Sequence, residues 1–205
     1  MIKQIEAYEP YNEQEERDKE IILSMLTEAE RMGEDIFSRE NRMAHMTASA
    51  WVVNRDRTKV LLAYHNIYNS WAWLGGHTDG ERNLLSVAVR EVCEESGLTP
   101  AHVRPAWLIS QKGDLSQGSA GDIFSLEVLA VDGHFKKGEY ISSHLHLNVT
   151  YLVEADEEER LRVKEDENSG VAWFTPEAAL AASTEPWFVE RVYRKLNEKV
   201  QKLLG

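Results

Sequence analysis

Three glutamates lie close together in the stretch from Gly75 to Leu98, GGHTDGERNLLSVAVREVCEESGL. If this stretch is helical, Glu94 and Glu95 both neighbour Glu91, because residues three and four apart share a helix face. Like charges at that spacing cost roughly 0.2–0.5 kcal/mol per pair. A hard divalent cation such as Mg²⁺ reverses that cost, since it binds through carboxylates together with substrate phosphates. The spacing therefore fits a metal site for phosphate chemistry, although a solvated helix face is the simpler interpretation of the glutamates alone.

The residues around the glutamates predict a helix that follows a glycine turn. Apolar residues recur at helical spacing, and Gly97 suits the left-handed residue just past a helix end. The apolar positions are Leu84, Leu85, Val87, Ala88, Val89 and Val92. Gly75 and Gly76 would let the preceding loop pass close to the helix and to bound metals, because glycine has no side chain to obstruct them.

The order of these parts resembles the signature of the Nudix hydrolases, G-x5-E-x7-R-E-U-x-E-E-x-G-U, in which U is an aliphatic residue. The second half matches at every fixed position: Arg90, Glu91, Val92, Glu94, Glu95, Gly97 and Leu98. The first half departs from the signature. Gly76 takes the place of the leading glycine, but Arg82 stands where the first glutamate belongs, and Glu81 lies one residue early. In the family that outer glutamate is an auxiliary to metal binding, so the departure bears on the number of metal ions.

The resemblance implies an α/β Nudix fold, a mixed central sheet sandwiched between helices, over about residues 46–182. It also implies a Nudix-type pyrophosphohydrolase that uses Mg²⁺ or Mn²⁺ to hydrolyse a phosphoanhydride bond in a nucleoside diphosphate linked to another moiety. Glu91, Glu94 and Glu95 are the expected metal ligands. Families with this signature act on many such compounds, and the fold does not choose among them.

Candidate catalytic residues lie inside and outside the helix. Hydrolysis of a diphosphate needs charge neutralisation and a positioned, activated water. In the family the base is a glutamate of this helix, such as Glu94, or one from a loop outside it. The outside candidates are Glu165 and Glu167, although an acidic loop is more often simply solvated. Arg90 is expected to orient Glu91 or a neighbouring carboxylate through a charge-assisted hydrogen bond.

Candidate substrate contacts lie in and before the glycine turn. Gly75, Gly76 and His77 belong to the loop beside the helix, where substrate contacts are common. Aromatic residues offer a stacking surface for a base, although core packing explains most tryptophans. These residues are Tyr64, Tyr68, Trp71 and, foremost, Trp73.

Two histidines share one face of a predicted strand. His144 and His146 are two residues apart, a spacing that could ligate a metal or contact phosphate. With no third histidine or cysteine nearby in the sequence, a partly buried polar strand face is the simpler interpretation.

Composition limits the classes of partner. The net charge of −12 argues against a protein that binds nucleic acid by neutralising phosphates. It also means that an anionic diphosphate is repelled unless divalent cations bridge it to the carboxylates. No stretch has the 18 or more apolar residues of a membrane helix, and the amino terminus lacks the apolar segment of a signal peptide. The lone cysteine, Cys93, excludes an internal disulfide and favours the cytoplasm; its acidic neighbours favour a packed residue over a nucleophile.

We expect two parts, a helical extension over residues 1–45 and a Nudix domain over residues 46–205 that includes a C-terminal helix. Within the extension, residues 12–32 carry one apolar stripe, which must pack on the following domain or form a homodimer contact. The stripe consists of Ile21, Ile22, Met25, Leu26, Ala29 and Met32. The domain is expected to contain strands at residues 47–53, 59–65, 71–74, 103–109, 123–131, 144–154 and 171–174. Helices are expected to begin at Pro176, with Thr175 as cap, and at Pro186.

Two other functions fit the same resemblance. One is an isomerase of the isopentenyl diphosphate type, which uses a divergent form of the signature. The other is a non-catalytic Nudix-like domain that senses a nucleotide, a class that usually has lost glutamates and carries a DNA-binding module. The intact Glu91, Glu94 and Glu95 and the absence of a basic module favour hydrolysis.

Overall fold

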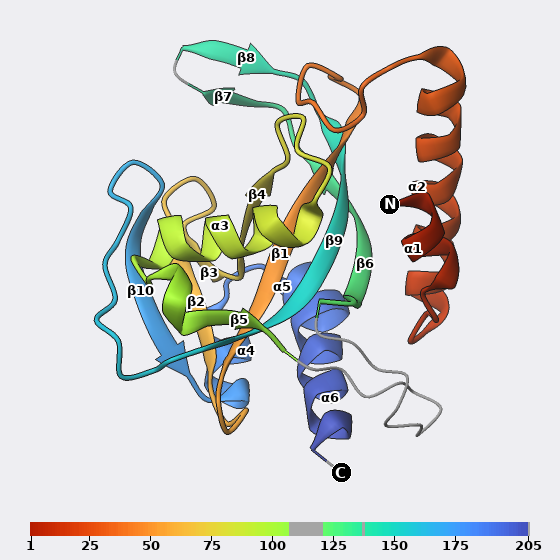
Figure 1. Cartoon of the computed structure of the whole chain (residues 1–205). Coiled ribbons are helices and arrows are strands. Elements are labelled where there is room, and N and C mark those ends of the chain that lie inside the picture. Colours follow the sequence, from red (N-terminus) through yellow and green to blue (C-terminus); the bar gives the residue numbers. More distant parts are fainter. Residues whose placement is uncertain (107–120, 137, 205) are drawn as a thin grey trace.

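The computed structural model describes residues 1–106, 121–136 and 138–204, and Figure 1 shows the arrangement of its elements. The helices are α1 (Ile2–Ala7), α2 (Glu13–Met32), α3 (Leu84–Ser96), η1 (Pro100–His102), α4 (Pro176–Ala182), α5 (Pro186–Phe188), η2 (Val189–Tyr193) and α6 (Arg194–Leu203). The strands are β1 (Ala44–Asn54), β2 (Val60–His65), β3 (Ser70–Ala72), β4 (Leu74–His77), β5 (Val103–Pro105), β6 (Ile123–Val131), β7 (His134–Lys136), β8 (Glu139–Ile141), β9 (His144–Ala155) and β10 (Asn168–Phe174). In these described ranges, no helix has an apolar stretch long enough to cross a membrane.

The main sheet is mixed and is built around β1. Its strand order is β10-β2-β1-β9-β5, with β3 beside β2, β4 beside β1 and β6 beside β9. β1 and β9 run parallel over their whole length, from Ala44 opposite Leu145 to Asn54 opposite Ala155. The other pairings in this sheet are antiparallel. The predicted α/β class with a mixed sheet is therefore confirmed.

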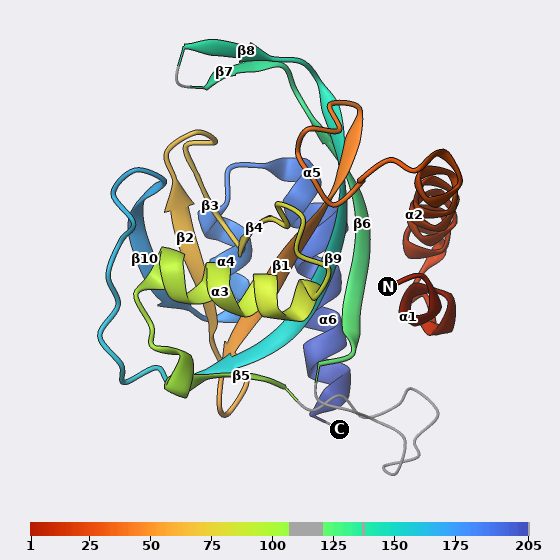
Figure 2. The ribbon, with the colours of Figure 1, turned by 45° about the horizontal axis from the view of Figure 1, so that its top comes forward.

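Helices cover both faces of the sheet, as Figure 2 shows for α3 on one face and α6 on the other. Successive residues of a strand point to opposite faces, so β1 contributes to both layers. Met46 and Ala48 belong to the core beneath α3. Trp51 belongs to the core beneath α6, where its ring stacks on that of Tyr193 with centroids 5.4 Å apart. This arrangement gives the predicted sandwich.

The amino-terminal helices lie beside β6 in both views (Figures 1 and 2). Three residues of the predicted stripe, Ile22, Leu26 and Ala29, are buried in the same core as the sheet residues. Ile21 and Met32 are exposed. The stripe thus packs on the sheet of its own chain, which is one of the two arrangements that the sequence leaves open.

A buried ionic cluster joins α2 to β6 and α6. Oε1 of Glu15 lies 3.0 Å from Nζ of Lys195 and 3.2 Å from Nζ of Lys199. Lys195 also contacts Glu127, at 3.0 Å. Burial acts to raise the pKa of Glu15, but the two lysines outweigh it and hold that pKa below its usual value. These charges are paired inside the protein, as buried charges must be.

Most of the predicted strands and helices are present, but several boundaries differ. β10 begins at Asn168, three residues before the predicted strand at residues 171–174, and the hairpin of β7 and β8 was not predicted. β1 begins three residues before the predicted strand because it continues pairing with β9. The predicted strand at residues 71–74 is two strands, since the chain leaves β2 after β3 and joins β1 as β4. β5 covers the start of the strand expected at residues 103–109, and residues 107–109 lie outside the described residues. The last helix contains a π-helical segment, η2.

Candidate functional site

Both ends of helix α3 are capped, and Gly97 stands at the end that the sequence predicts. The Asn83 side chain accepts a hydrogen bond from the backbone N–H of Ser86, at 3.2 Å, and so caps the first turn. At the other end Gly97 has φ 71°, the left-handed conformation, and its N–H donates to the carbonyl of Cys93. The helix therefore ends at Ser96, directly before Gly97, and holds its glutamates in its last two turns.

The three glutamates differ strongly in exposure. The side chain of Glu95 is fully buried, that of Glu91 is 12% exposed and that of Glu94 is 45% exposed. Burial, with the nearby charge of Glu91, raises the pKa of Glu95 well above its usual value. Burial likewise raises the pKa of Glu91. The three carboxylates thus lie at different depths, from Glu95 in the interior to Glu94 at the surface. The raised pKa values mean that the protein does not fully stabilise the ionised forms of Glu91 and Glu95.

Only one of the two carboxylate oxygens of Glu95 accepts a hydrogen bond in the described part of the chain. Its Oε1 accepts a hydrogen bond from the backbone N–H of Gly75, at 3.1 Å. Its Oε2 is buried and has no hydrogen-bond partner in the described part of the chain. The Nε2 of His65 lies 3.4 Å from this oxygen, but burial lowers the pKa of His65 and the ring faces the carbonyl of Trp73. Burial therefore favours the neutral form of this imidazole.

The two glycines before α3 are required for different reasons. A Cβ atom on Gly76 would lie 2.7 Å from Cδ of Glu91. A Cβ atom on Gly75 would lie 2.6 Å from the carbonyl oxygen of Ala48, in the neighbouring strand β1. Gly76 thus leaves room for a carboxylate, whereas Gly75 leaves room for the backbone of the sheet.

Arg90 lies against the carboxylates. Its Nη2 donates to Oε1 of Glu91 at 3.0 Å and to the carbonyl of His77 at 3.4 Å. Its Nε lies 3.7 Å from Oε1 of Glu94. The predicted contact between Arg90 and Glu91 is confirmed, and the same guanidinium connects the helix to the glycine turn.

Lys164 joins the acidic loop to the helix, a contact that the sequence does not indicate. Its Nζ lies 3.1 Å from Oε2 of Glu94 and 3.1 Å from Oε2 of Glu167. Partial burial opposes the charged form, but the two carboxylates prevail and raise the pKa of Lys164. Glu167 is thereby placed near the glutamates of α3, whereas Glu165 is exposed. The only local signal for this lysine is its i,i+3 spacing from Glu167.

The position that departs from the Nudix signature faces the amino-terminal extension. Nη2 of Arg82 lies 3.3 Å from Oδ1 of Asp35, and its guanidinium covers the ring of Phe37 at 4.6 Å from the centroid. Glu81 accepts a hydrogen bond from the N–H of Asn83, at 2.7 Å. None of these contacts of Arg82 and Glu81 involves the carboxylates of Glu91, Glu94 or Glu95.

The same part of the extension holds the turn before α3. The carbonyl of Phe37 accepts hydrogen bonds from the hydroxyl of Thr78 and, at 2.9 Å, from the N–H of Gly80. Nε and Nη2 of Arg39 donate to the two carboxylate oxygens of Asp79, at 2.6 and 2.5 Å. The extension thus orders the turn that leads into α3.

Two other predicted residues have clear surroundings. Trp73 is 8% exposed, and its ring contacts those of Tyr193 and Phe188 with centroids 5.8 and 6.3 Å apart. Core packing accounts for these contacts, so a role of Trp73 in substrate binding stays a prediction. Cys93 is half-buried, and burial together with Glu159 and Glu94 raises the pKa of its thiol. This agrees with a packed cysteine and not with a nucleophile.

The sequence model of the NUDIX domain matches residues 43–196. The chain belongs to the NUDIX domain family. The Nudix fold predicted from the sequence is confirmed, and so is the expected Nudix-type pyrophosphohydrolase at the level of the family. Among curated proteins, none matches the sequence.

Solved Nudix structures share the fold at low sequence identity. The C. elegans Ap4A hydrolase in a binary complex aligns with a TM-score of 0.50 and 15% identity, over 78% of this chain and 96% of that one. A NUDIX family hydrolase from Clostridium perfringens aligns with a TM-score of 0.50 and 22% identity, over 80% and 99% of the two chains. The M. smegmatis Nudix hydrolase RenU has a TM-score of 0.50 and 14% identity, over 79% and 88%. At these identities the likeness bears on the fold alone.

The residues of α3 fit a hard divalent cation. Carboxylate oxygens are the ligands that Mg²⁺ and Mn²⁺ prefer. Glu95 holds a buried oxygen without a hydrogen-bond partner in the described residues, and Glu91 and Glu95 both have raised pKa values. A cation would satisfy that oxygen and stabilise the ionised carboxylates. Lys164 and Arg90 already supply positive charge on the more exposed side, at Glu94.

Proposed function

We propose that this Nudix protein hydrolyses a phosphoanhydride bond in a nucleoside diphosphate linked to another moiety, with Mg²⁺ or Mn²⁺ held by Glu91, Glu94 and Glu95. The observation that carries the proposal is the buried, unpartnered Oε2 of Glu95 within a cluster of three carboxylates. Such a cluster can accept a diphosphate only with positive charge between the two. A bound divalent cation would supply that charge and would polarise the phosphate oxygens.

Other residues of the chain hold the carboxylates and the glycine turn in position. Arg90 donates hydrogen bonds to Glu91 and to the carbonyl of His77. These bonds hold the Glu91 carboxylate in a fixed position relative to the glycine turn. Gly76 leaves the space that the Glu91 carboxylate occupies. These contacts supply the preorganisation on which phosphoryl transfer depends.

A base must take a proton from the attacking water. Glu94 is the most exposed of the three helix glutamates, and Lys164 connects it to Glu167. We therefore favour Glu94 or Glu167 as the base. Glu165, which is exposed in the same loop, is the less favoured candidate. Lys164 would stabilise the carboxylate form of its two partners and would meet an incoming phosphate with a positive charge.

Helix α3 does not by itself select the substrate, the cellular compartment or the oligomeric state. The substrate is proposed to be a small nucleotide-type diphosphate contacted by Gly75, Gly76, His77 and Trp73. The protein is proposed to work in the cytoplasm, on the basis of its lone cysteine. A homodimer stays a prediction, and the exposed Ile21 and Met32 are the stripe residues left for such a contact.

The deciding experiment is a phosphate-release screen across nucleoside diphosphate derivatives, coupled to a phosphatase that exposes phosphomonoester products. Ap4A belongs in the panel because the aligned C. elegans structure is that of an Ap4A hydrolase. Each compound is tested with Mg²⁺, with Mn²⁺ and with a chelator. We expect turnover on one class of compound that the chelator abolishes.

Variants connect that turnover to α3. Glu94→Gln and Glu95→Gln should each lower kcat by orders of magnitude and leave the circular dichroism spectrum unchanged. Glu190→Gln is the matched control, since Glu190 pairs only with the exposed Arg194 in the described structure. Near-normal turnover in both helix variants would overturn the metal assignment. Silence on every compound, with the protein folded and binding metal, would favour nucleotide sensing or an isomerase instead.

A further inference from the structure

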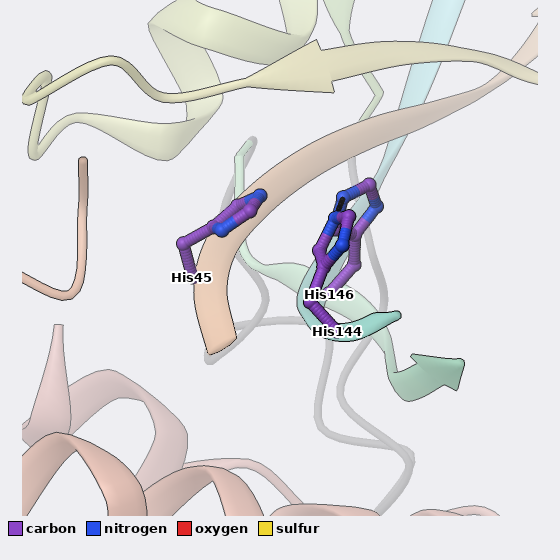
Figure 3. Close-up of side chains that lie close together, drawn as sticks. All are labelled: His45, His144 and His146. Carbon is purple, nitrogen blue, oxygen red and sulfur yellow. Dashed lines mark hydrogen bonds between the residues drawn. The ribbon is translucent and has the colours of Figure 1, made fainter. Parts of the chain in front are cut away.

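Histidines from distant parts of the chain gather at one end of the main sheet. His45 lies near the start of β1, and His144 and His146 lie at the start of β9. Because β1 and β9 are parallel, His45 stands directly opposite His146. The three side chains point toward one another in Figure 3. They lie on the sheet face opposite α3, since Ala44 and Met46, their alternate neighbours on β1, belong to the core beneath that helix.

The geometry of the three rings fits a common ligand. One ring nitrogen from each of the three residues lies within 4.8 Å of one from each of the others. Nε2 of His144 is 3.1 Å from Nε2 of His146. With metal–nitrogen bonds of about 2.0–2.1 Å, ligand nitrogens in a tetrahedral zinc site lie roughly 3.3 Å apart. One pair already has this spacing, and small side-chain rotations would bring in the third.

Two of the rings are oriented by backbone carbonyls. Nδ1 of His45 lies 2.9 Å from the carbonyl of Asn41, and Nδ1 of His144 lies 2.8 Å from the carbonyl of Ser142. A carbonyl can only accept, so each Nδ1 carries the proton and each Nε2 presents a lone pair. This is the arrangement in which metal-binding histidines are usually held.

His45 supplies the strongest sign that a ligand is expected. The residue is 4% exposed, and its Nε2 is buried without a hydrogen-bond partner in the described ranges. A buried acceptor left unsatisfied destabilises the folded protein. A metal ion among the three rings would satisfy this nitrogen.

The charges around the cluster permit a cation. Arg39 faces His45 and His146, but its guanidinium forms a two-fold hydrogen-bonded pair with Asp79. The ring of His77 also borders the cluster, with its centroid 5.1 Å from that of His45. The surroundings are thus imidazoles and one balanced ion pair.

We infer that His45, His144 and His146 form a binding site for a borderline transition-metal ion, Zn²⁺ in the first place, separate from the carboxylates of α3. Neutral imidazoles favour Zn²⁺, Co²⁺, Ni²⁺ and Cu²⁺, whereas carboxylates favour Mg²⁺ and Mn²⁺. The two sites therefore select different ions. Three protein ligands leave a fourth position for water. A bound ion would fasten the start of β1 to the start of β9.

The inference is tested with metal alone and needs no enzymatic activity, so it does not depend on the proposed function. The full chain, purified without a polyhistidine tag and freed of metal, is titrated with Co²⁺ while excess Mg²⁺ occupies the carboxylates of α3. We expect one Co²⁺ per chain with the strong visible absorption of four-coordinate cobalt. Added Zn²⁺ should abolish that absorption and raise the melting temperature of the protein.

Matched variants locate the site. His144→Gln and His146→Gln should each weaken Co²⁺ binding about 100-fold, the upper end of what even outer-shell changes at metal sites produce. They should also lose the rise in melting temperature with Zn²⁺. His102→Gln is the control, since His102 is exposed and pairs with Glu159 at 2.7 Å. Equal Co²⁺ binding in folded His144→Gln, His146→Gln and unaltered protein, or no cobalt absorption in the unaltered protein, would overturn the inference.

Discussion

Gly76 and the carboxylate of Glu91 occupy adjoining space, such that a Cβ atom at position 76 would lie 2.7 Å from Cδ of Glu91. The obstacle is the end of a side chain, which can move, and not backbone. Gly76→Ala should therefore fold but displace the carboxylate. We expect a loss of kcat and weaker Mg²⁺ binding in the calorimeter, with little change in melting temperature.

Gly75→Ala makes the contrasting test of the glycine turn. Its Cβ would lie 2.6 Å from the carbonyl oxygen of Ala48, in the sheet. Overpacking of this kind costs about 1–3 kcal/mol, so the free energy of unfolding should fall by that amount in urea titrations. The assignment of separate roles fails if Gly76→Ala keeps full activity, or if the two variants lose stability equally.

Removal of the positive charge at Lys164 should strengthen cation binding. Its Nζ lies 3.1 Å from the Glu94 carboxylate, where it would compete with a bound metal ion. A charge pair at about 4 Å is worth about 1 kcal/mol in water, which corresponds to about fivefold in a binding constant. Lys164→Met should lower the Kd for Mg²⁺ by about this factor, and raise KM if the lysine also meets substrate phosphate. Lys59→Met, which loses a surface pair with Glu157, is the control; equal Mg²⁺ affinities in the two variants would count against the prediction.

Arg82→Glu restores the glutamate that the Nudix signature has at this position. It replaces a cation that now pairs with Asp35 by a carboxylate near the start of α3. We expect tighter Mg²⁺ binding by calorimetry. Arg82→Gln separates loss of the positive charge from gain of a ligand, and the prediction requires the glutamate variant to bind more tightly than the glutamine variant.

The buried pair of Glu15 with Lys195 should make stability depend on acid. The pKa of Glu15 is lowered in the folded protein, so the folded state keeps a carboxylate where the unfolded state binds a proton. The stabilisation is therefore complete above the unfolded value of about 4.3 and is lost as the pH falls through the lower folded pKa. This window can be followed in urea titrations at successive pH values.

Glu15→Gln should remove that acid dependence and destabilise the protein at neutral pH. It leaves Lys195 and Lys199 buried with one charge fewer to balance them, and breaking a buried pair costs about 3–5 kcal/mol. Glu20→Gln, which disrupts an exposed pair with Arg17, should leave the free energy of unfolding nearly unchanged. A Glu15→Gln protein as stable as the Glu20→Gln protein would refute the role of the buried pair.

The parts of this protein whose structure is local can be predicted from its sequence. Gly97 ends α3 as predicted, and the spacing of Glu91, Glu94 and Glu95 places the carboxylates on that helix. The alternation in β9 correctly separates the face of Leu147 from the face that carries His146. Caps, helix periodicity and strand alternation depend on neighbours within a few residues, and a sequence displays these directly.

Contacts between residues far apart in the sequence emerge from the tertiary structure alone. The sequence offers no third histidine near His144 and His146, yet the parallel pairing of β1 with β9 places His45 beside them. Lys164 reaches Glu94 because its loop folds back along α3, and Glu15 finds Lys195 because α2 packs beside β6. Such contacts follow from strand order and the docking of helices, which are set by the collective burial of apolar surface and have no local signature.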